Sequence, residues 1–287
     1  MSKDSVKVAF QGEPGAFSEQ AARALVAADI TLVASRTFDE MFEAVQTASV
    51  DCAVAPIENS LAGSVIRNYE LLAKHDLTII GETRLKIVHN LIALPGVELT
   101  AVTRVYSHPV ALAQCEKFLG ANPRIEIVPA YDTAGSVKMI VERNRRDEAA
   151  IASREAASRY GAEIIVEGIE DNAENYTRFL LLTRPDRAGR VKTRATGGAR
   201  KTSIAFRFAN HPGGLFRALA AFALRDIDLT KIESRPIEGR PWEYLFYLDF
   251  VGDLGDPKVE RALGHLAEMA ESIRVFGSYS TTVIGGQ

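Results

Sequence analysis

A basic segment divides this chain into two parts and limits what it can fold into. Residues 184–201 carry seven arginine or lysine residues, one proline and three glycines, with almost no large apolar side chain. A nucleic-acid-binding tail would need interleaved aromatic residues for base stacking, and this segment has none. We therefore interpret residues 184–201 as a solvated linker between two domains, which a length of 287 residues also favours.

Before the linker, segments with strand character alternate with helical patterns. Residues 6–10 alternate apolar with other residues, and residues 52–55 form an apolar run that ends at Pro56. This alternation is typical of α/β proteins with mainly parallel sheets. Further strands are predicted near 77–80, 87–94, 104–106, 125–128, 149–152, 164–166 and 179–182, with helices at 109–119, 134–143 and 154–160.

After the linker the pattern changes to strand, helix, strand, strand, helix, strand. This order, over about 80 residues, predicts a ferredoxin-like βαββαβ fold. Small open sheets of this kind expose an edge strand that favours association with another copy. The predicted elements cover residues 203–208, 214–224, 227–232, 244–251, 259–270 and 273–276.

Composition excludes several classes of protein. A formal net charge of −3 gives no general attraction to nucleic acid or to an anionic membrane. Cys52 and Cys115 stand far apart without a CxxC pair, and the five histidines have no metal-ligand spacing. Phosphate-binding, dinucleotide-binding and metalloprotease motifs are also absent from the sequence. Without a signal-peptide pattern or a membrane span, we expect a cytoplasmic protein with no metal.

Small polar clusters follow several predicted strands. They lie at residues 12–18, 58–64, 107–109 and 131–135, and a further cluster at 175–179 precedes a strand. In open α/β sheets, ligands bind beyond the carboxyl ends of strands, where helix N-termini present free N–H groups. The alternative is that these residues only cap helices and form turns. Together they predict a site for a small anion.

Read in order, these clusters resemble the prephenate dehydratase family. The stretch from Gln11 to Ser18 resembles the first family signature, and Pro56 to Ser60 with Gly63-Ser64 resembles the second. Residues 175–179 contain the Thr-Arg-Phe stretch that marks the family, and 107–109 and 132–135 fall in the expected order. After the linker, residues 210–215 and 232–236 resemble the two effector motifs of the ACT domain attached to these enzymes.

The resemblance implies the fold of each part. The catalytic domain would have two lobes like those of a type II periplasmic binding protein, with the active site between them. The second domain would be an ACT domain with a ferredoxin-like fold. The implied limits are 1–183 for the catalytic domain (lobe 1 about 1–84 and 167–183, lobe 2 about 85–166), 184–201 for the linker and 202–287 for the ACT domain.

The resemblance also implies a reaction. The family removes water and carbon dioxide from prephenate to give phenylpyruvate in phenylalanine biosynthesis, a lyase reaction that needs no cofactor. Thr177 would assist the departing hydroxyl group, and Glu58 is an alternative acid or a capping carboxylate. Arg178 would either clamp a substrate carboxylate or form a structural salt bridge.

Other polar residues of the motifs are candidates for binding prephenate. Ser18 could instead cap its helix, and Phe179 could instead belong to the core. The same chemistry on arogenate, whose side chain carries an ammonium group, remains an alternative, as does a non-catalytic module that binds a small anion. The substrate-binding candidates are Ser18, Asn59, Ser60, Ser107, Gln114, Thr133 and Phe179.

In the ACT domain, the resemblance implies a site for phenylalanine as an allosteric inhibitor. The family more often has alanine at position 214, so Gly214 should make the turn slightly looser. The strand from Glu233 onward would face a partner subunit in a homodimer or homotetramer. The effector-binding candidates are Asn210, Pro212, Gly213, Gly214, Leu215, Glu233, Ser234 and Arg235.

Overall fold

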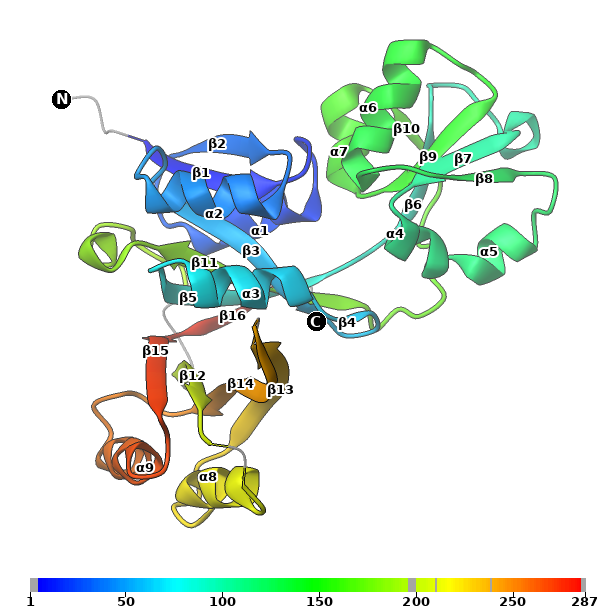
Figure 1. Cartoon of the computed structure of the whole chain (residues 1–287). Coiled ribbons are helices and arrows are strands. Elements are labelled where there is room, and N and C mark those ends of the chain that lie inside the picture. Colours follow the sequence, from blue (N-terminus) through cyan, green and yellow to red (C-terminus); the bar gives the residue numbers. More distant parts are fainter. Residues whose placement is uncertain (1–4, 196–199, 210, 238, 285–287) are drawn as a thin grey trace.

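The computed structural model describes residues 5–195, 200–209, 211–237 and 239–284. Within these residues the chain forms two α/β lobes and a smaller α/β domain that packs against the first lobe (Figure 1). The expected fold class, a two-lobed domain of the periplasmic-binding-protein type followed by a βαββαβ domain, is confirmed. No helix in these ranges is long and apolar enough to cross a membrane.

Lobe 1 is built on one sheet. Its elements are β1 (Val6–Gln11), α1 (Phe17–Leu25), β2 (Ile30–Ser35), α2 (Phe38–Gln46), β3 (Cys52–Asn59), β4 (Gly63–Ser64), α3 (Ile66–Lys74), β5 (Thr78–Lys86), β11 (Tyr176–Thr183) and β16 (Thr281–Ile284). The strand order is β16-β5-β11-β3-β1-β2, with β4 paired to β3. The sheet is mixed rather than mainly parallel, because β11 returns from lobe 2 antiparallel to β3 and β5.

Helices cover both faces of this sheet, and the side chains of β11 alternate between the two covered faces. Successive side chains of a strand point to opposite faces. Phe179 and Leu181 pack with Leu25 of α1, whereas Leu180 and Leu182 pack with residues of α2 and α3. A strand buried on both faces reads as a continuous apolar run, which is why residues 179–182 were recognisable in the sequence.

Lobe 2 has the strand order β10-β6-β9-β7-β8. Its elements are β6 (Asn90–Ala93), η1 (Leu99–Ala101), β7 (Arg104–Ser107), α4 (Pro109–Ala113), α5 (Glu116–Gly120), β8 (Glu126–Pro129), α6 (Thr133–Arg143), β9 (Glu148–Ala152), α7 (Arg154–Tyr160) and β10 (Glu163–Val166). The single helix predicted for 109–119 is instead two short helices, separated by Gln114 and Cys115. The chain crosses between the lobes twice, at 87–89 and at 167–175.

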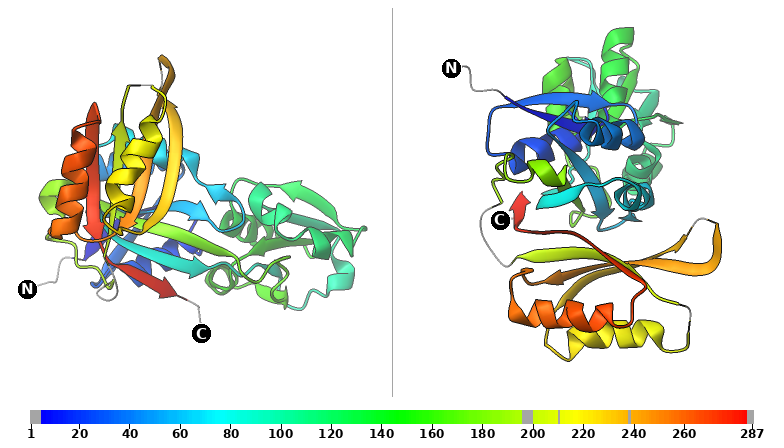
Figure 2. Two further views of the ribbon diagram at one scale, coloured as in Figure 1. Left: turned by 90° about the horizontal axis from the view of Figure 1, so that it is seen from below. Right: turned by 60° about the vertical axis from the view of Figure 1, so that its left-hand side comes forward.

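The ACT domain is an antiparallel sheet with the order β13-β14-β12-β15. Its elements are β12 (Lys201–Arg207), α8 (Gly214–Ala223), β13 (Leu229–Ile237), β14 (Arg240–Val251), α9 (Pro257–Ala267) and β15 (Ser272–Tyr279). Both helices cover the face turned away from lobe 1, as the right-hand view of Figure 2 shows. The other face contributes Ala205, Tyr247 and Phe276 to the core of lobe 1, so the two domains share one apolar cluster.

Two segments differ from the sequence interpretation. The linker is not simply solvated: Val191 and Ala195 are buried in the lobe 1 core, and the backbone N–H of Arg194 donates to Leu25. These side chains are small, so the segment lacked an apolar signal. In addition, residues 281–284 do not belong to the ACT sheet, because β16 pairs in parallel with β5 of lobe 1.

The contact between β15 and β5 leaves no room for a side chain at Gly277. A Cβ atom there would lie 2.2 Å from the carbonyl oxygen of Ile79, and the φ angle of +154° is one that other residues rarely adopt. We expect Gly277→Ala to lower the free energy of unfolding by about 1–3 kcal/mol. Urea denaturation measures this change.

The matched control is Gly264→Ala in α9, where a Cβ atom would meet nothing within 4 Å. This substitution should raise stability by up to about 1 kcal/mol, because alanine favours a helix over glycine. Equal effects of the two substitutions would contradict the close approach of β15 to β5.

Candidate active site

A cleft of about 460 Å³ lies between the lobes. Lobe 1 contributes Ser18, Asn59 and Thr177 to its lining, and lobe 2 contributes Gln114 and Thr133. Asn59 ends the parallel strand β3, and Ser18 and Thr133 lie in the first turns of helices that follow the parallel strands β1 and β8, the position where open α/β sheets bind ligands. The structure therefore brings five of the predicted site residues together.

Asn59 and Thr177 face each other across the β3–β11 pair. The side-chain amide Nδ2 of Asn59 donates to Thr177 Oγ1 at 2.9 Å. The orientation of this amide is fixed because its Oδ1 atom accepts from the backbone N–H groups of Leu61 and Ala62. Thr177 Oγ1 is thus an acceptor in this contact, and its own proton is left to donate elsewhere.

Gln114 and His89 extend this chain of hydrogen bonds. Gln114 Oε1 accepts from Asn175 Nδ2 at 2.9 Å and lies 2.9 Å from His89 Nε2. Its Nε2 atom donates to Asn59 Oδ1 at 3.2 Å, which joins lobe 2 to lobe 1. Because Gln114 Oε1 can only accept, His89 Nε2 carries the proton in this contact. In the series His89, Gln114, Asn59, Thr177, each side chain therefore donates a hydrogen bond to the next.

His89 was not singled out from the sequence. It lies in the crossing between the lobes, and its burial lowers its pKa from the ordinary value of 6.5. Its ring contacts that of Phe17 edge to face, with centroids 5.8 Å apart. Ile87 and Val88 before it are apolar and the histidine spacing is irregular, so no sequence signal marks it. Gln11, His108 and Tyr131 also line the cleft; they lie in the predicted polar clusters and motifs but were not singled out as site residues.

Two helix N-termini border the cleft. Ser18 lies in the first turn of α1, whose N-cap is Ala16, so its hydroxyl group lines the cleft without being the N-cap side chain. Thr133 is the first residue of α6, and Asp132 caps that helix by accepting from the N–H of Gly135. Burial raises the pKa of Asp132. Free N–H groups and hydroxyls at such helix ends suit an anionic ligand.

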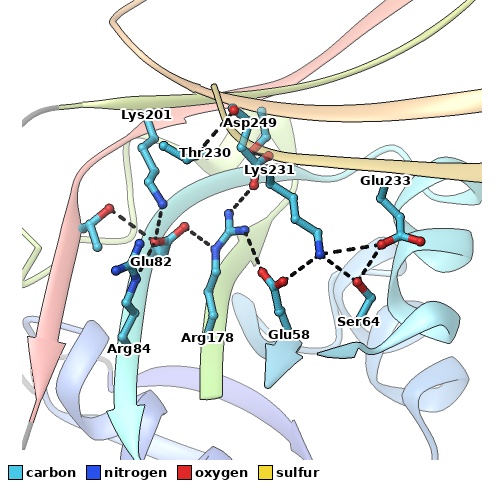
Figure 3. A network of polar contacts seen from close by, with 12 residues as sticks. Glu58, Ser64, Glu82, Arg84, Arg178, Lys201, Thr230, Lys231, Glu233 and Asp249 are labelled. Atoms are coloured by element: carbon cyan, nitrogen blue, oxygen red, sulfur yellow. Dashed lines mark hydrogen bonds and ion pairs between the residues drawn. The ribbon is translucent and has the colours of Figure 1, made fainter. Parts of the chain in front are cut away.

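Glu58 and Arg178 do not lie in the cleft, contrary to their predicted catalytic roles. Each precedes or follows a cleft residue on its strand, and alternation turns both toward the ACT domain (Figure 3). Arg178 is buried between Glu82 at 2.6 Å and Asp249 at 2.6 Å. Glu58 accepts from Lys231 Nζ at 2.7 Å. Of the two roles considered for Arg178, the structure supports the salt bridge.

Three substrate-binding candidates are also placed elsewhere. Phe179 belongs to the core beneath α1. Ser107 is fully buried and donates to the carbonyl of Ile151 at 2.6 Å, which fixes β7 against its neighbour. Ser60 donates to the carbonyl of Glu174 and accepts from the N–H of Tyr176, so it holds the start of β11. Their motif positions are explained by structure rather than by ligand contact.

The effector candidates fall on two faces of the ACT sheet. Asn210 lies outside the described residues. Gly213 has a φ of +77° and is the N-cap of α8, with Pro212 before it and Leu215 half-exposed in the first turn. A Cβ atom at Gly214 would lie 2.5 Å from the ring of Phe208, so an aromatic side chain fills the space and the turn is not looser.

On β13, the pairing separates the remaining candidates. Ser234 pairs with Phe246, whose ring stacks on Phe208 at 5.2 Å, so Ser234 lies on the helix-covered side near the Gly213 turn. Glu233 points the other way and accepts from Ser64 of β4, which corrects the expectation that it faces a partner subunit. Arg235 lies within 3.9 Å of Glu233.

Comparisons with known proteins define the class of this chain. The profile of the prephenate dehydratase family matches residues 8–187, and that of the ACT domain matches residues 202–267. Together they describe a dehydratase domain joined to a regulatory domain. The chain belongs to the prephenate dehydratase family and is therefore an enzyme of phenylalanine biosynthesis that acts on prephenate or arogenate.

Individual relatives agree with this class. Arogenate dehydratase/prephenate dehydratase 2, chloroplastic, from Arabidopsis thaliana is 46% identical over 96% of this chain and 72% of its own length. A crystal structure of prephenate dehydratase from Arthrobacter aurescens in complex with L-Phe has a TM-score of 0.86 and 34% identity, covering 96% of this chain and 90% of that one. A structure described as GqqA, a novel type of quorum quenching acylase, has a TM-score of 0.85 and 33% identity over 96% and 98% of the two chains.

The cytoplasmic location predicted from the sequence is contradicted by these comparisons. Arabidopsis thaliana relatives that are 42–46% identical to this chain are named chloroplastic. The prediction rested on the cysteine content and on the lack of a signal-peptide pattern. Neither observation specifies a compartment.

The buried His89 predicts a dependence of stability on pH. Its lowered pKa means that, as pH falls below 6.5, the unfolded chain binds a proton before the folded chain does. The contribution of neutral His89 to the free energy of unfolding should be fully present above pH 6.5 and be lost as the pH falls through the lowered pKa of His89. His89→Gln should reduce the decline of stability with falling pH without abolishing it, because burial also lowers the pKa values of His75 and His108.

Urea denaturation above and below pH 6.5 measures the effect in both proteins. The relevant quantity is the difference between the two pH values, which cancels the direct cost of the substitution. An identical difference in the unmodified chain and in His89→Gln would contradict a buried, neutral His89.

Proposed function

We propose that this chain is a prephenate dehydratase that converts prephenate to phenylpyruvate, water and carbon dioxide. The observation that carries the proposal is the direction of the hydrogen bond between Asn59 and Thr177. Because Asn59 donates, the proton of the Thr177 hydroxyl group is left free to be donated to a ligand in the cleft, which Thr177 lines. A hydrogen-bond donor beside the departing hydroxyl group is what the reaction requires.

In the reaction, the C–C bond to the ring carboxylate breaks and carbon dioxide leaves. The electron pair moves into the ring, the C–O bond to the ring hydroxyl group breaks, and the ring becomes aromatic. The departing hydroxide takes a proton to form water. A threonine hydroxyl is a weak acid, so Thr177 assists by hydrogen bonding in the transition state, and solvent finally supplies the proton.

The cleft suits a dicarboxylate that must lose one of its carboxylates. Its described lining contains hydroxyl, amide and imidazole groups, two helix N-termini and the carboxyl group of Asp132, whose pKa is raised by burial, but no lysine or arginine. Neutral donors hold a carboxylate without the strong stabilisation of a buried ion pair. Such a site therefore binds the substrate without opposing decarboxylation, and it does so without the arginine clamp that was one of the two roles considered for Arg178.

Turnover of prephenate and arogenate by the purified chain, side by side, tests the substrate. We expect phenylpyruvate formation from prephenate to have the higher kcat/KM. Preference for arogenate would retain the site and the chemistry but change the substrate, and plant relatives carry both activities in their names.

The same assay tests Thr177. Thr177→Val keeps the shape of the side chain and removes the hydroxyl group, and it should lower kcat by about 10²–10⁴-fold. Thr177→Ser is the matched control and should retain most activity. Near-normal turnover by Thr177→Val would remove Thr177 from the mechanism.

An acylase activity, suggested by one structural relative, has less support from this site. A nucleophilic hydroxyl needs a base within hydrogen-bonding distance. The Thr177 hydroxyl is instead paired with the Asn59 amide, and none of the hydrogen bonds of the described residues joins Thr177 to a histidine. Membership in a family of dehydratases, rather than this geometry, favours an enzyme over a module that only binds an anion.

The ACT domain supports inhibition by phenylalanine. The turn around Gly213 exposes N–H groups at the start of α8, beside the Phe208–Phe246 stack, so a carboxylate and an aromatic ring both find partners. A relative of 34% identity was solved with L-Phe. Leu215 and Phe216 of α8 and Ile232 of the edge strand β13 are exposed apolar residues, which favours a homo-oligomer built through the ACT domain.

We expect millimolar L-phenylalanine to inhibit the full chain, whereas D-phenylalanine should have little effect. Coupling between such sites typically changes affinity by about 5–150-fold. Initial rates at several prephenate concentrations, with and without effector, measure this. Unchanged rates at saturating L-phenylalanine would contradict regulation through the ACT domain.

A further inference from the structure

Asn59 sits at the start of a short hairpin whose other end lines the cleft. Glu58 of β3 pairs with Ser64 of β4, and Asn59 pairs with Gly63. The tip is held by Asn59 Oδ1, which accepts from Leu61 and Ala62. The position of Asn59, and hence its hydrogen bond to Thr177, therefore depends on this hairpin (residues 58–64).

Side chains of the ACT domain bind the base of this hairpin (Figure 3). Lys231 Nζ of β13 donates to Glu58 Oε1 at 2.7 Å and to Ser64 Oγ at 2.8 Å. Glu233, two residues further along β13, accepts from Ser64 Oγ at 2.7 Å. The Lys231 side chain is only 14% exposed, so solvent screens these contacts weakly. Both strands of the hairpin base are thus tied to one strand of the other domain.

We propose that Lys231 and Glu233 are positioning residues for the active site, so that the ACT edge strand sets Asn59 against Thr177. This inference rests on the proposed role of Thr177. Neither residue touches the cleft, and both act through Glu58 and Ser64 on the hairpin that carries Asn59. A shift of about 1 Å in a positioning group can reduce a rate by about a hundredfold.

The geometry of β13 connects this contact with the proposed effector site on the other face of the ACT sheet. Lys231 and Glu233 point to lobe 1, whereas Ile232 and Ser234 alternate to the other face, on the side of the Gly213 turn. Side chains on the two faces of a strand are attached to the same backbone. A ligand or a second subunit that displaces residues on one face of β13 therefore displaces those on the other face as well. The β13 strand thus carries a signal from the effector face directly to the hairpin.

Another ion pair of the same interface offers a matched control. Lys201 of β12 is buried like Lys231 and donates to Glu82 of β5 at 2.9 Å, away from the hairpin. Lys201→Met leaves Glu82 paired with Arg178. Comparison of Lys231→Met with Lys201→Met therefore separates an effect on the hairpin from a general loss of charge between the domains.

We expect Lys231→Met to lower kcat by about tenfold or more with little change in KM, and Lys201→Met to have a much smaller effect. In an Asn59→Ala background, Lys231→Met should have almost no further effect, because the group that it positions is already missing. An equal fall in both backgrounds, or an equal fall in both lysine variants, would overturn the proposal.

Hydrogen exchange of the full chain provides a readout independent of activity. Lys231→Met should accelerate exchange about tenfold at the amides of Leu61 and Ala62 in the hairpin and of Val65 directly after it, and Lys201→Met should not. Unchanged exchange at these amides would overturn the positioning role. If the unmodified chain turns over neither prephenate nor arogenate, the proposed function fails, and the exchange result alone decides whether β13 holds the hairpin.

Discussion

The antiparallel pairing of β3 with β11 is the constraint on which the site and the domain interface both depend. It brings Asn59 opposite Thr177 and Glu58 opposite Arg178. Because side chains alternate along a strand, the first pair faces the cleft and the second faces the ACT domain. A shift of β11 by one residue would turn Thr177 away from the cleft and Arg178 into it, which would break both pairs and destroy both surfaces. The buried ion pairs of Arg178 with Glu82 and Asp249 oppose such a shift, because it would break both of them.

The interface side of this pairing is unusually polar for a buried surface. Burial by itself would lower the pKa of Arg178, but the charges of Asp249 and Glu82 raise it well above its ordinary value. Glu82 is fully buried and also accepts from Lys201. Buried ion pairs add little net stability because desolvation offsets their attraction, but their geometry is demanding. Their main effect here is to fix the angle between the domains, while the shared apolar cluster supplies the stabilising burial.

Much of the fold could be predicted from the sequence. Alternating strand and helix patterns located most elements of both lobes, and the βαββαβ order of the ACT domain was visible in the changed pattern. β16 could not be assigned to lobe 1 from its sequence, because its pairing partner β5 lies about two hundred residues earlier in the chain. The packed linker was missed because Val191 and Ala195 contribute little hydrophobic signal.

The site was predicted less completely. Motifs identified Asn59, Gln114 and Thr177, but a contiguous motif on a strand supplies residues to both faces, and only pairing shows which face is the cleft. Glu58 and Arg178 were misplaced for this reason. His89 lacked any signal, since a neutral histidine in an apolar crossing resembles a core residue until its partner Gln114 is seen.

The pairing of β16 with β5 means that the ACT domain is connected to lobe 1 at both of its ends. Before it, residues 190–195 are bonded to the end of α1 and the segment that follows it, and after it, β16 extends the central sheet. Two attachments restrict the reorientation of a domain more than a single flexible linker does. A rotation about the line through the two attachments would displace β13 most, because β13 lies at the edge of the sheet opposite β15, and the contacts of Lys231 and Glu233 with lobe 1 oppose that rotation.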